Sequence, residues 1–189
     1  EAEKRGVAIT NTPGLLTPRT VAEFAFANML TLAKRLIEAD RYIKTGKYSG
    51  WDPMILHGVQ IEGKTLGIVG LGRIGNHMAQ QAVKGFGMKV IYSDVVRNEK
   101  FEAEFGAVYQ ESVEEVLKEA DFVSLHVPLL DSTRHLINKE RLELMKPGAI
   151  LVNTARGSVV DEAALVEALK SGRIRGGLFG CLRKRAKAR

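Results

Sequence analysis

The sequence predicts an α/β protein built on a doubly wound parallel sheet, and three observations support that prediction. Short apolar segments alternate with segments of helical periodicity along most of the 189-residue chain. The apolar segments, such as "LGIVG" and "AILVN", contain almost no polar residue, as strands buried on both faces do. Strands that alternate with helices in this way pair in parallel, with helices on both sides of the sheet. The length suits one domain of ordinary size.

The first part of the chain predicts a short strand, a long helix and a loop. Residues 7–10, "VAIT", form an apolar segment that we expect to be a strand. Thr17 and Pro18 are expected to be the N-cap and the first helical residue. Apolar residues then recur at helical spacing, which predicts one helix that continues to about Thr45. The glycine-rich segment 46–54 is expected to be a loop.

The rest of the chain alternates regularly between the two kinds of element. The remaining strands are expected within residues 64–70, 88–94, 107–110, 121–128, 148–154 and 176–180. The helices between them are expected at 73–85, 99–105, 112–118, 139–145 and 161–171. Ser112 is the expected N-cap of the third of these helices.

Composition excludes several functional classes. Hydrophobic residues make up 45% of the chain and charged residues 26%, as in globular proteins. The net charge of +6 is concentrated in the C-terminal segment 181–189, which contains five basic residues and no acidic one. The rest of the chain is nearly neutral, so neither nucleic acid nor a membrane is the expected partner. No apolar run approaches the roughly 20 residues that span a bilayer. A single cysteine, Cys181, excludes an internal disulfide and favours a cytoplasmic location.

The strongest chemical signal is a glycine-rich turn between an apolar strand and a helix. Gly70, Gly72 and Gly75 form the pattern G-x-G-x-x-G in "GIVGLGRIG". The first glycine permits a tight turn, the second lets a pyrophosphate approach the backbone, and the third lets helix and strand pack closely. The N–H groups at the start of the helix then face the phosphate. The pattern indicates a dinucleotide site of the Rossmann type; the alternative is a purely structural turn.

Asp94 strengthens the dinucleotide interpretation and selects the cofactor. It ends the next apolar strand, 19 residues after Gly75, where an acidic residue holds the ribose 2′-hydroxyl of NAD. An aspartate there repels the 2′-phosphate of NADP, so NAD is favoured. Arg97 lies close enough in the sequence to weaken that preference.

A second stretch, "LVNTARG", places Thr154, Ala155 and Arg156 directly after a buried strand. In an open parallel sheet the ligand binds beyond the carboxyl ends of the strands, so Arg156 is directed at the cofactor crevice. Its guanidinium group can hold a substrate carboxylate with two parallel hydrogen bonds. The alternative is that Arg156 caps backbone carbonyls or pairs with Asp161, and the residues alone do not decide between the two.

The chain resembles the D-isomer-specific 2-hydroxyacid dehydrogenases, the family of phosphoglycerate dehydrogenase and glyoxylate/hydroxypyruvate reductase. The matching stretches include "TNTPG", "GKTLGIVGLGRIG", "DFVSLHVPL", "LMKPGAILVNTARG" and "VVDEAALVEAL", in order from about residue 7 to residue 177. Such enzymes have two domains, and the resemblance implies that the substrate domain is missing here. Residues 1–10 would then be the last strand of a truncated substrate domain, and 11–178 the NAD-binding domain with a long interface helix.

The resemblance also implies roles for the matching residues. The glycine loop, Asp94, and the pair Val127 and Pro128 would bind the pyrophosphate, the adenosine ribose and the adenine side of NAD, respectively. Thr154, Ala155 and Arg156 would meet the nicotinamide side, with Arg156 binding the carboxylate of a small 2-hydroxy or 2-keto acid. The loop residues concerned are Gly70, Leu71, Gly72, Arg73, Ile74 and Gly75. Hydride transfer at C2 is the implied reaction, a homodimer the implied assembly, and no metal is implied. The alternative is a module that senses NAD without turnover, as in a corepressor of this fold.

The C-terminal residues depart from the family's pattern. Arg185 stands where the family has the glutamate that orients the catalytic histidine, and Gly180 stands where it has an aspartate. The histidine itself would lie beyond Arg189, and none of the four histidines present is expected to replace it. Codons can be chosen for Leu-Asp-Val-Phe-Glu-Lys-Glu-Pro that, read one base early, encode residues 179–186. We therefore expect 179–189 to be an aberrant basic tail produced by a frameshift, and the chain to bind NAD weakly without dehydrogenase activity.

Overall fold

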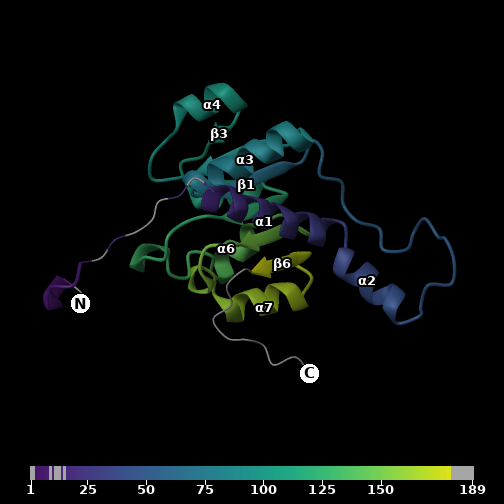
Figure 1. The fold of residues 1–189 in the computed structure, drawn as a ribbon. Helices are drawn as coiled ribbons and strands as arrows, with labels where there is room; N and C mark the ends of the chain where they lie inside the picture. Colours follow the sequence, from purple (N-terminus) through teal and green to yellow (C-terminus); the bar gives the residue numbers. More distant parts are fainter. Residues whose placement is uncertain (1–2, 9, 11–13, 15, 180–189) are drawn as a thin grey trace.

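The fold is a six-stranded sheet in which every pair of neighbouring strands is parallel. It is known from a computed structural model that describes residues 3–8, 10, 14 and 16–179 (Figure 1). The strands are β1 Thr65–Val69, β2 Lys89–Ser93, β3 Val108–Tyr109, β4 Phe122–Leu125, β5 Ile150–Asn153 and β6 Gly176–Phe179. Their order in the sheet is β3-β2-β1-β4-β5-β6. The chain therefore builds the sheet outward from β1 in one direction to β3, and then outward from β1 in the other direction from β4 to β6. The doubly wound parallel sheet that the sequence predicts is confirmed, including a strand at 176–179.

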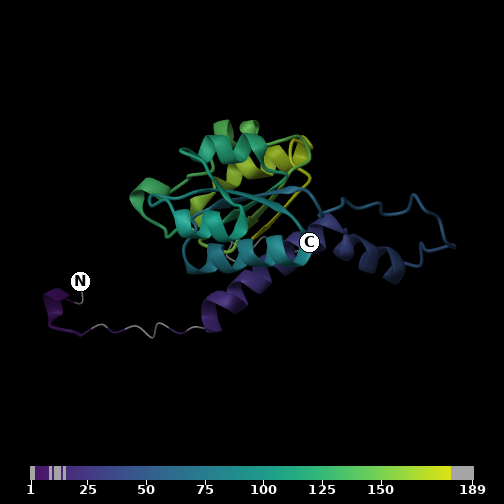
Figure 2. The same cartoon turned by 90° about the horizontal axis from the view of Figure 1, so that it is seen from above.

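Helices cover both faces of the sheet. They are α1 Leu16–Ala33, α2 Leu36–Lys44, α3 Arg73–Phe86, α4 Glu99–Phe105, α5 Val113–Glu119, α6 Lys139–Leu144 and α7 Glu162–Lys170. Short 3₁₀ turns lie at Glu3–Arg5, Asp131–Thr133 and Gly157–Val159. Seen from above, α1, α3 and α4 lie on one side of the sheet and α5, α6 and α7 on the other (Figure 2).

The two faces have separate apolar cores. On one face Phe26 and Met29 of α1 and Met78 of α3 pack with Leu66 and Ile68 of β1. The rings of Phe26 and Phe86 stack with centroids 5.1 Å apart and join α1 to α3. The core of the other face is formed by α5, α6 and α7 against β1, β4 and β5. Burial of both faces explains why the strands contain so few polar residues.

Local sequence signals set the helix boundaries. The Ser112 hydroxyl accepts a hydrogen bond from the Glu115 N–H, and the Glu115 carboxylate accepts one from the Ser112 N–H, so the predicted N-cap is a capping box. The side chains of Asn98, Asn138 and Asp161 cap α4, α6 and α7 by accepting hydrogen bonds from backbone N–H groups of the first turn. These caps fix the short helices that lead into the carboxyl edge of the sheet.

The expectation of one helix from Thr17 to about Thr45 is wrong. Helix α1 begins at Leu16, so Thr17 is not its N-cap, and it ends at Ala33. The Ala33 carbonyl accepts a hydrogen bond from the Val59 N–H at 2.9 Å, so it is not available to continue the helix. Arg35 then takes a left-handed conformation (φ 55°) before α2 begins. The helix is ended by a chain segment that returns 26 residues later in the sequence, and not by a helix-breaking residue.

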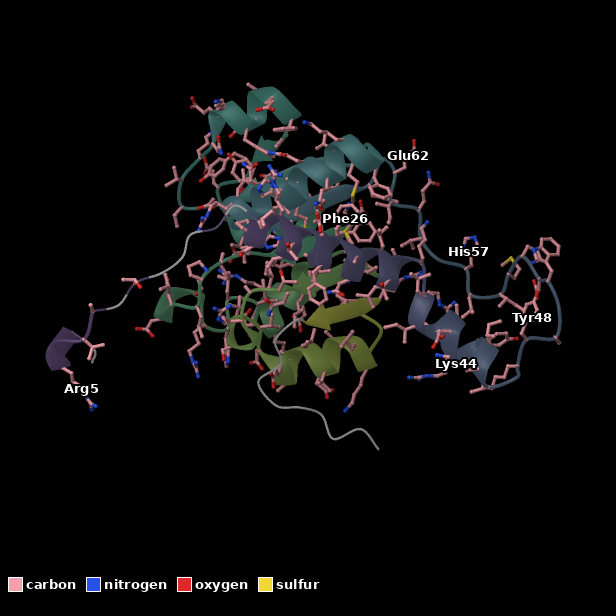
Figure 3. All side chains as sticks on the ribbon, viewed as in Figure 1. Arg5, Phe26, Lys44, Tyr48, His57 and Glu62 are labelled. Carbon is pink, nitrogen blue, oxygen red and sulfur yellow. The ribbon has the colours of Figure 1, made fainter. Side chains whose placement is uncertain are left out.

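The expected strand at 7–10 is also not found among the residues described there. Val7, Ala8 and Thr10 have no strand conformation, and Val7 is exposed. An isolated extended segment exchanges no hydrogen bonds with a neighbour, and water satisfies its backbone groups instead. The expected loop at 46–54 is confirmed; it continues from α2 and projects from the body, where Figure 3 labels Tyr48 and His57.

Candidate functional site

The candidate site lies where the order of the strands reverses. β1, β2 and β4 are neighbours, and their carboxyl ends at Val69, Ser93 and Leu125 meet at one edge of the sheet. Open α/β sheets bind ligands at such a position, because the loops diverge there and leave a crevice. The glycine loop follows β1 into this crevice and leads directly into α3.

Each of the three positions in the loop requires or exploits glycine for a different physical reason. A Cβ on Gly75 would lie 2.2 Å from the Gly70 carbonyl oxygen, so the start of α3 packs against the turn without room for a side chain. Gly70 has a φ of 93°, and a Cβ there would lie 2.9 Å from the His126 carbonyl oxygen. Around a Cβ on Gly72, by contrast, no atom of the described residues lies within 4 Å. Gly70 and Gly75 build the turn, and Gly72 leaves its outer surface open.

Asp94 is fixed to the glycine loop. Its Oδ2 accepts a hydrogen bond from the Leu71 N–H at 2.6 Å, and its Oδ1 accepts a longer one from the Val96 N–H at 3.4 Å. The Tyr109 hydroxyl donates to the Asp94 carbonyl oxygen at 3.4 Å. The carboxylate therefore stands at the carboxyl end of β2, beside the backbone that would carry a pyrophosphate.

A cavity of about 720 Å³ opens between these groups. It brings together five of the residues singled out in the sequence, namely Gly70, Gly72, Asp94, Val127 and Pro128. A second cavity of about 280 Å³ lies on the other side of the loop and contains Gly72, Arg73 and Ile74. Both volumes are lined by His126, so the two cavities flank the glycine loop.

Thr154, Ala155 and Arg156 lie at the same edge of the sheet but do not line these two cavities. They follow β5, whose last residue Asn153 is buried and pairs in register with Leu125 of β4. The Asn153 side chain donates to the Arg156 carbonyl at 2.9 Å and accepts from the Ala155 N–H at 3.0 Å, which shapes the loop. Asn153 is thus a positioning residue for the loop.

The exposed Arg156 side chain contacts the backbone of the preceding residue. Its Nη1 donates to the Ala155 carbonyl at 2.9 Å, while Asp161 accepts hydrogen bonds from Ala163 and Ala164 at the start of α7. Of the alternatives left open by the sequence, capping of a carbonyl is what the structure shows. The bond leaves most of the guanidinium donors free, because arginine carries five N–H groups.

Several cavity residues were not predicted from the sequence. They are Val69, Ser93, Val95, Tyr109, Glu111, Ser112, Val113, Glu114, His126, Leu130, Ser132, Thr133, Leu136 and Arg141. Arg141 donates to Glu114 at 2.9 and 2.6 Å and to the Leu136 carbonyl, and this pairing lowers the pKa of Glu114. The signal available in the sequence was their position at or after the carboxyl ends of the first four strands, where loops meet the crevice.

His126 is the histidine that lines both cavities at the glycine loop. Its Nε2 lies 2.9 Å from the Ser124 hydroxyl and 3.4 Å from the Met78 sulfur. Its Nδ1 is buried and has no partner among the described residues. Burial lowers the pKa of His126 to about 4, so the imidazole is neutral at physiological pH. His57, in contrast, lies on the projecting segment (Figure 3).

The described residues fit a dinucleotide. The larger cavity has the size of an ordinary cofactor pocket, and the open surface at Gly72 leaves space beside the backbone. Gly72 provides no side-chain cap for α3, so the first N–H groups of that helix are available to phosphate oxygens. The Thr154 hydroxyl is buried and has no partner among the described residues, as expected of a group that awaits a ligand.

The described residues contain neither a candidate metal site nor a membrane-spanning helix. No group of three or more histidine, cysteine, aspartate and glutamate side chains in residues 3–8, 10, 14 and 16–179 is arranged to hold a metal ion. Within the same residues no helix combines the length and the apolar character needed to cross a bilayer.

Comparison with known proteins gives a consistent result. A family model described as the D-isomer specific 2-hydroxyacid dehydrogenase, NAD binding domain, matches residues 26–183. A glyoxylate reductase of Korarchaeum cryptofilum is 54% identical over 177 residues, which are 93% of this chain and 52% of that protein. A glyoxylate reductase of Thermococcus litoralis is 52% identical over 180 residues, 93% of this chain and 54% of the relative.

The solved structures agree with the sequence relatives. The structure of a D-lactate dehydrogenase from Aquifex aeolicus, complexed with NAD and lactic acid, superposes with a TM-score of 0.86 at 41% identity. That match covers 97% of this chain and 53% of the other. The chain therefore spans about half the length of the curated relatives and of this solved structure.

Proposed function

The chain belongs to the D-isomer specific 2-hydroxyacid dehydrogenase family, and from that premise we propose that it is the NAD-binding part of an oxidoreductase acting on small 2-hydroxy and 2-keto acids. The observation that carries the proposal is the cradle at the carboxyl ends of β1 and β2. There Gly72 and Asp94 line the larger cavity, no described atom lies within 4 Å of a Cβ on Gly72, and α3 begins directly after Gly72. This is the arrangement that binds a pyrophosphate and a ribose together.

Each group in the cradle has a distinct role in this proposal. The backbone from Leu71 to Ile74 binds the pyrophosphate through N–H groups and the positive end of the α3 dipole. Asp94 accepts hydrogen bonds from the adenosine ribose while the Leu71 N–H holds it in place. Val127 and Pro128 provide an apolar contact for the adenine and its ribose. NAD, when bound, supplies or takes up a hydride at C2 of the acid.

Arg156 is the proposed substrate residue. Its side chain is exposed and presents a planar fork of donors. Such a fork binds a carboxylate and draws electron density from the neighbouring carbonyl. In the structure its side chain donates one hydrogen bond to the Ala155 carbonyl, and we propose that it leaves this position when substrate binds.

The chain by itself is proposed to bind NAD without turnover. Transfer of a hydride to a keto acid also needs a proton donor. His126 lines both cavities at the glycine loop, but its low pKa leaves it unprotonated at neutral pH. Arg185, at the family's glutamate position, lies outside the described residues, so the frameshift hypothesis for 179–189 stays a proposal. The nucleotide sequence after the Leu178 codon decides it, because the alternative frame must read as a family sequence.

Calorimetric titration tests this function directly. We expect NAD to bind the chain and NADP to bind more weakly, and we expect no oxidation of NADH in the presence of glyoxylate or hydroxypyruvate. Absence of NAD binding by a folded sample contradicts the cofactor assignment. Turnover above background contradicts the proposed inactivity. If a longer reading frame that contains the glutamate and the histidine is also inactive, the NAD-sensing module is favoured over the enzyme.

The assembly proposed is a homodimer, formed through α1 and the segment that follows it. We call residues 36–56 the arm. The arm extends away from the sheet, and α2 within it has no buried residue (Figure 1). Large apolar side chains in it are more than half exposed: Leu36, Ile37, Ile43, Tyr48, Trp51 and Met54. An apolar surface of this kind is typical of an interface.

A further inference from the structure

Arg97 lies close to the adenosine end of the larger cavity but is engaged by another residue. Its Nε donates to Glu102 Oε1 at 3.0 Å, and its Nη2 donates to Glu102 Oε2 at 2.8 Å. The guanidinium carbon is 5.6 Å from the centroid of the Tyr109 ring, and that ring lines the cavity. Arg97 also follows Asp94 by three residues, and through Tyr109 its guanidinium group lies next to the wall of the cavity that contains Asp94.

Glu102 is the fixed member of this pair. Its Oε1 also accepts a hydrogen bond from the Tyr92 hydroxyl at 2.7 Å, and the same hydroxyl accepts one from the Asn98 N–H. Tyr92 is fully buried in β2, and burial together with the neighbouring Glu102 raises its pKa to about 12, so the hydroxyl stays a donor. The Glu102 side chain is 15% exposed and that of Arg97 55%. Arg97 is therefore the member of the pair that is free to move.

This pairing decides what a 2′-phosphate meets at the cavity. A dinucleotide with a free 2′-hydroxyl donates to Asp94 and needs no cation. A dinucleotide with a 2′-phosphate brings added negative charge next to Asp94, and it needs a guanidinium group to offset the repulsion. Glu102 neutralises the only arginine within three residues of Asp94 and occupies its fork.

We propose that Glu102 is a specificity-determining residue, which excludes dinucleotides bearing a 2′-phosphate by holding Arg97 in the ion pair. Asp94 supplies the direct repulsion, and Glu102 withholds the cation that would relieve it. The inference rests on the proposed binding of NAD at the glycine loop. It differs from a purely stabilising role for the pair, because a surface ion pair that only supports α4 has no effect on the choice of cofactor.

The test measures binding of NAD and NADP to the full chain by calorimetry, without any activity assay. Glu102→Gln keeps an acceptor for the Tyr92 hydroxyl and removes the charge that holds Arg97. We expect the Kd for NADP to fall by about fivefold or more, as one freed charged hydrogen bond allows, and the Kd for NAD to stay within about twofold. In the double variant Glu102→Gln, Arg97→Gln the gain for NADP is lost.

Glu104→Gln is the matched control. Glu104 is an exposed residue of α4, so the variant changes the net charge equally without touching Arg97. We expect it to leave both Kd values within about twofold of the wild type, since exposed charges are screened. An equal gain for NADP in this control overturns the proposal, because the effect would then be one of overall charge.

The remaining outcomes separate this inference from the proposed function. If Glu102→Gln binds NAD as the wild type does and NADP no better, the specificity role is wrong and the cofactor site stands. If the wild type is folded and binds neither dinucleotide, both the proposed function and this inference fail. Should Glu102→Gln not fold, Arg97→Gln alone carries the test. It removes a cation already withheld from the site, so a loss of NADP binding beyond about twofold overturns the proposal.

Discussion

At the scale of single residues, different glycines of the six-residue loop serve packing and ligand binding. Gly75 carries the packing constraint, because a Cβ there meets the Gly70 carbonyl oxygen at 2.2 Å. The atom in the way belongs to the backbone and cannot rotate aside. We expect Gly75→Ala to lower the free energy of unfolding by about 1–3 kcal/mol, as overpacking does. Urea denaturation measures this, and an unchanged midpoint contradicts the close approach.

Gly72→Ala is expected to leave the stability of the protein unchanged and to weaken the binding of NAD. Gly72 has a φ of −68°, which alanine adopts without strain, and no described atom lies within 4 Å of the added methyl group. The free energy of unfolding is therefore expected to stay within about 0.5 kcal/mol of the wild type. The methyl group does occupy the surface that a pyrophosphate approaches, so calorimetry is expected to show NAD binding weakened by about tenfold or more. Undiminished NAD binding places the pyrophosphate elsewhere.

His126 gives the protein a defined dependence on pH. Burial lowers its pKa from 6.5 to about 4 in the folded state. Between these two values the unfolded chain binds a proton that the folded protein does not, so acid favours unfolding there. The stability contributed by the neutral imidazole is complete above pH 6.5 and is lost as the pH falls to about 4. The loss amounts to about 3 kcal/mol at most.

Denaturation curves at several pH values between 4 and 7 measure this dependence. In His126→Gln the decline in stability over that window is expected to be smaller, since no imidazole remains to be protonated at this site. His57→Gln is the matched control, because His57 lies on the projecting arm-to-β1 segment (Figure 3). An identical decline in the wild type and in His126→Gln rules out His126 as the cause.

Residue roles were predictable from the sequence only where a backbone motif fixes the geometry. Gly70, Gly72 and Asp94 could be placed because strand, turn and helix define their spacing. The hydrogen bond from the Leu71 N–H to Asp94 depends on a pairing between β1 and β2 that spacing alone does not supply. Arg156 could be placed at the sheet edge, but its contact with Ala155 is a rotamer choice that no pattern encodes. The binding roles of these residues remain predictions.

At the scale of elements, the break between α1 and α2 creates the arm. Apolar residues recur at helical spacing on both sides of Arg35, so periodicity predicts one helix. The decisive contact is the bond from the Val59 N–H to the Ala33 carbonyl, between segments far apart in sequence. Sequence patterns describe local preferences and therefore miss a helix end set by tertiary structure. The other helices were predicted to within two residues.

The exposed apolar side chains of the arm make the proposed dimer testable. We expect the double variant Ile43→Glu, Trp51→Ser to shift the chain from dimer to monomer in light scattering coupled to size-exclusion chromatography. Both side chains are more than half exposed, so the change removes interface area without creating a cavity in the monomer. Lys118→Glu, a charge change at an exposed position of α5 outside the arm, is the control and is expected to leave the mass unchanged. A wild type that is monomeric at every concentration contradicts the proposal.

At the scale of the whole molecule, the sheet was predictable because one rule governs it throughout. Alternation of apolar strands and helices implies parallel pairing, and parallel pairing implies covered faces. Residues 7–10 were predicted wrongly because a strand needs a neighbour, and none of the described strands lies beside Val7, Ala8 or Thr10. An apolar segment has a tendency to form a strand, but it does so only where the rest of the structure provides a neighbouring strand.

The crevice and the sheet are linked through folding, which gives the last prediction. Gly70, Asp94 and Val127 line one cavity but come from three segments, so the site exists only when β1, β2 and β4 are paired. A ligand that binds only the folded state raises the free energy of unfolding by about 2.7 kcal/mol at a hundredfold excess over Kd. We expect saturating NAD to raise the melting temperature by roughly 5–10 °C.

Thermal denaturation with and without NAD measures that shift, and Gly72→Ala supplies the control. The variant is expected to melt at the wild-type temperature without ligand and to show a much smaller shift with NAD, because only the pyrophosphate surface has changed. A full shift in Gly72→Ala would mean that NAD binds away from the glycine loop. Equal shifts with NAD and NADP would mean that Asp94 does not discriminate between them. Only a shift that depends on both Gly72 and the 2′-position locates the cofactor between β1 and β2.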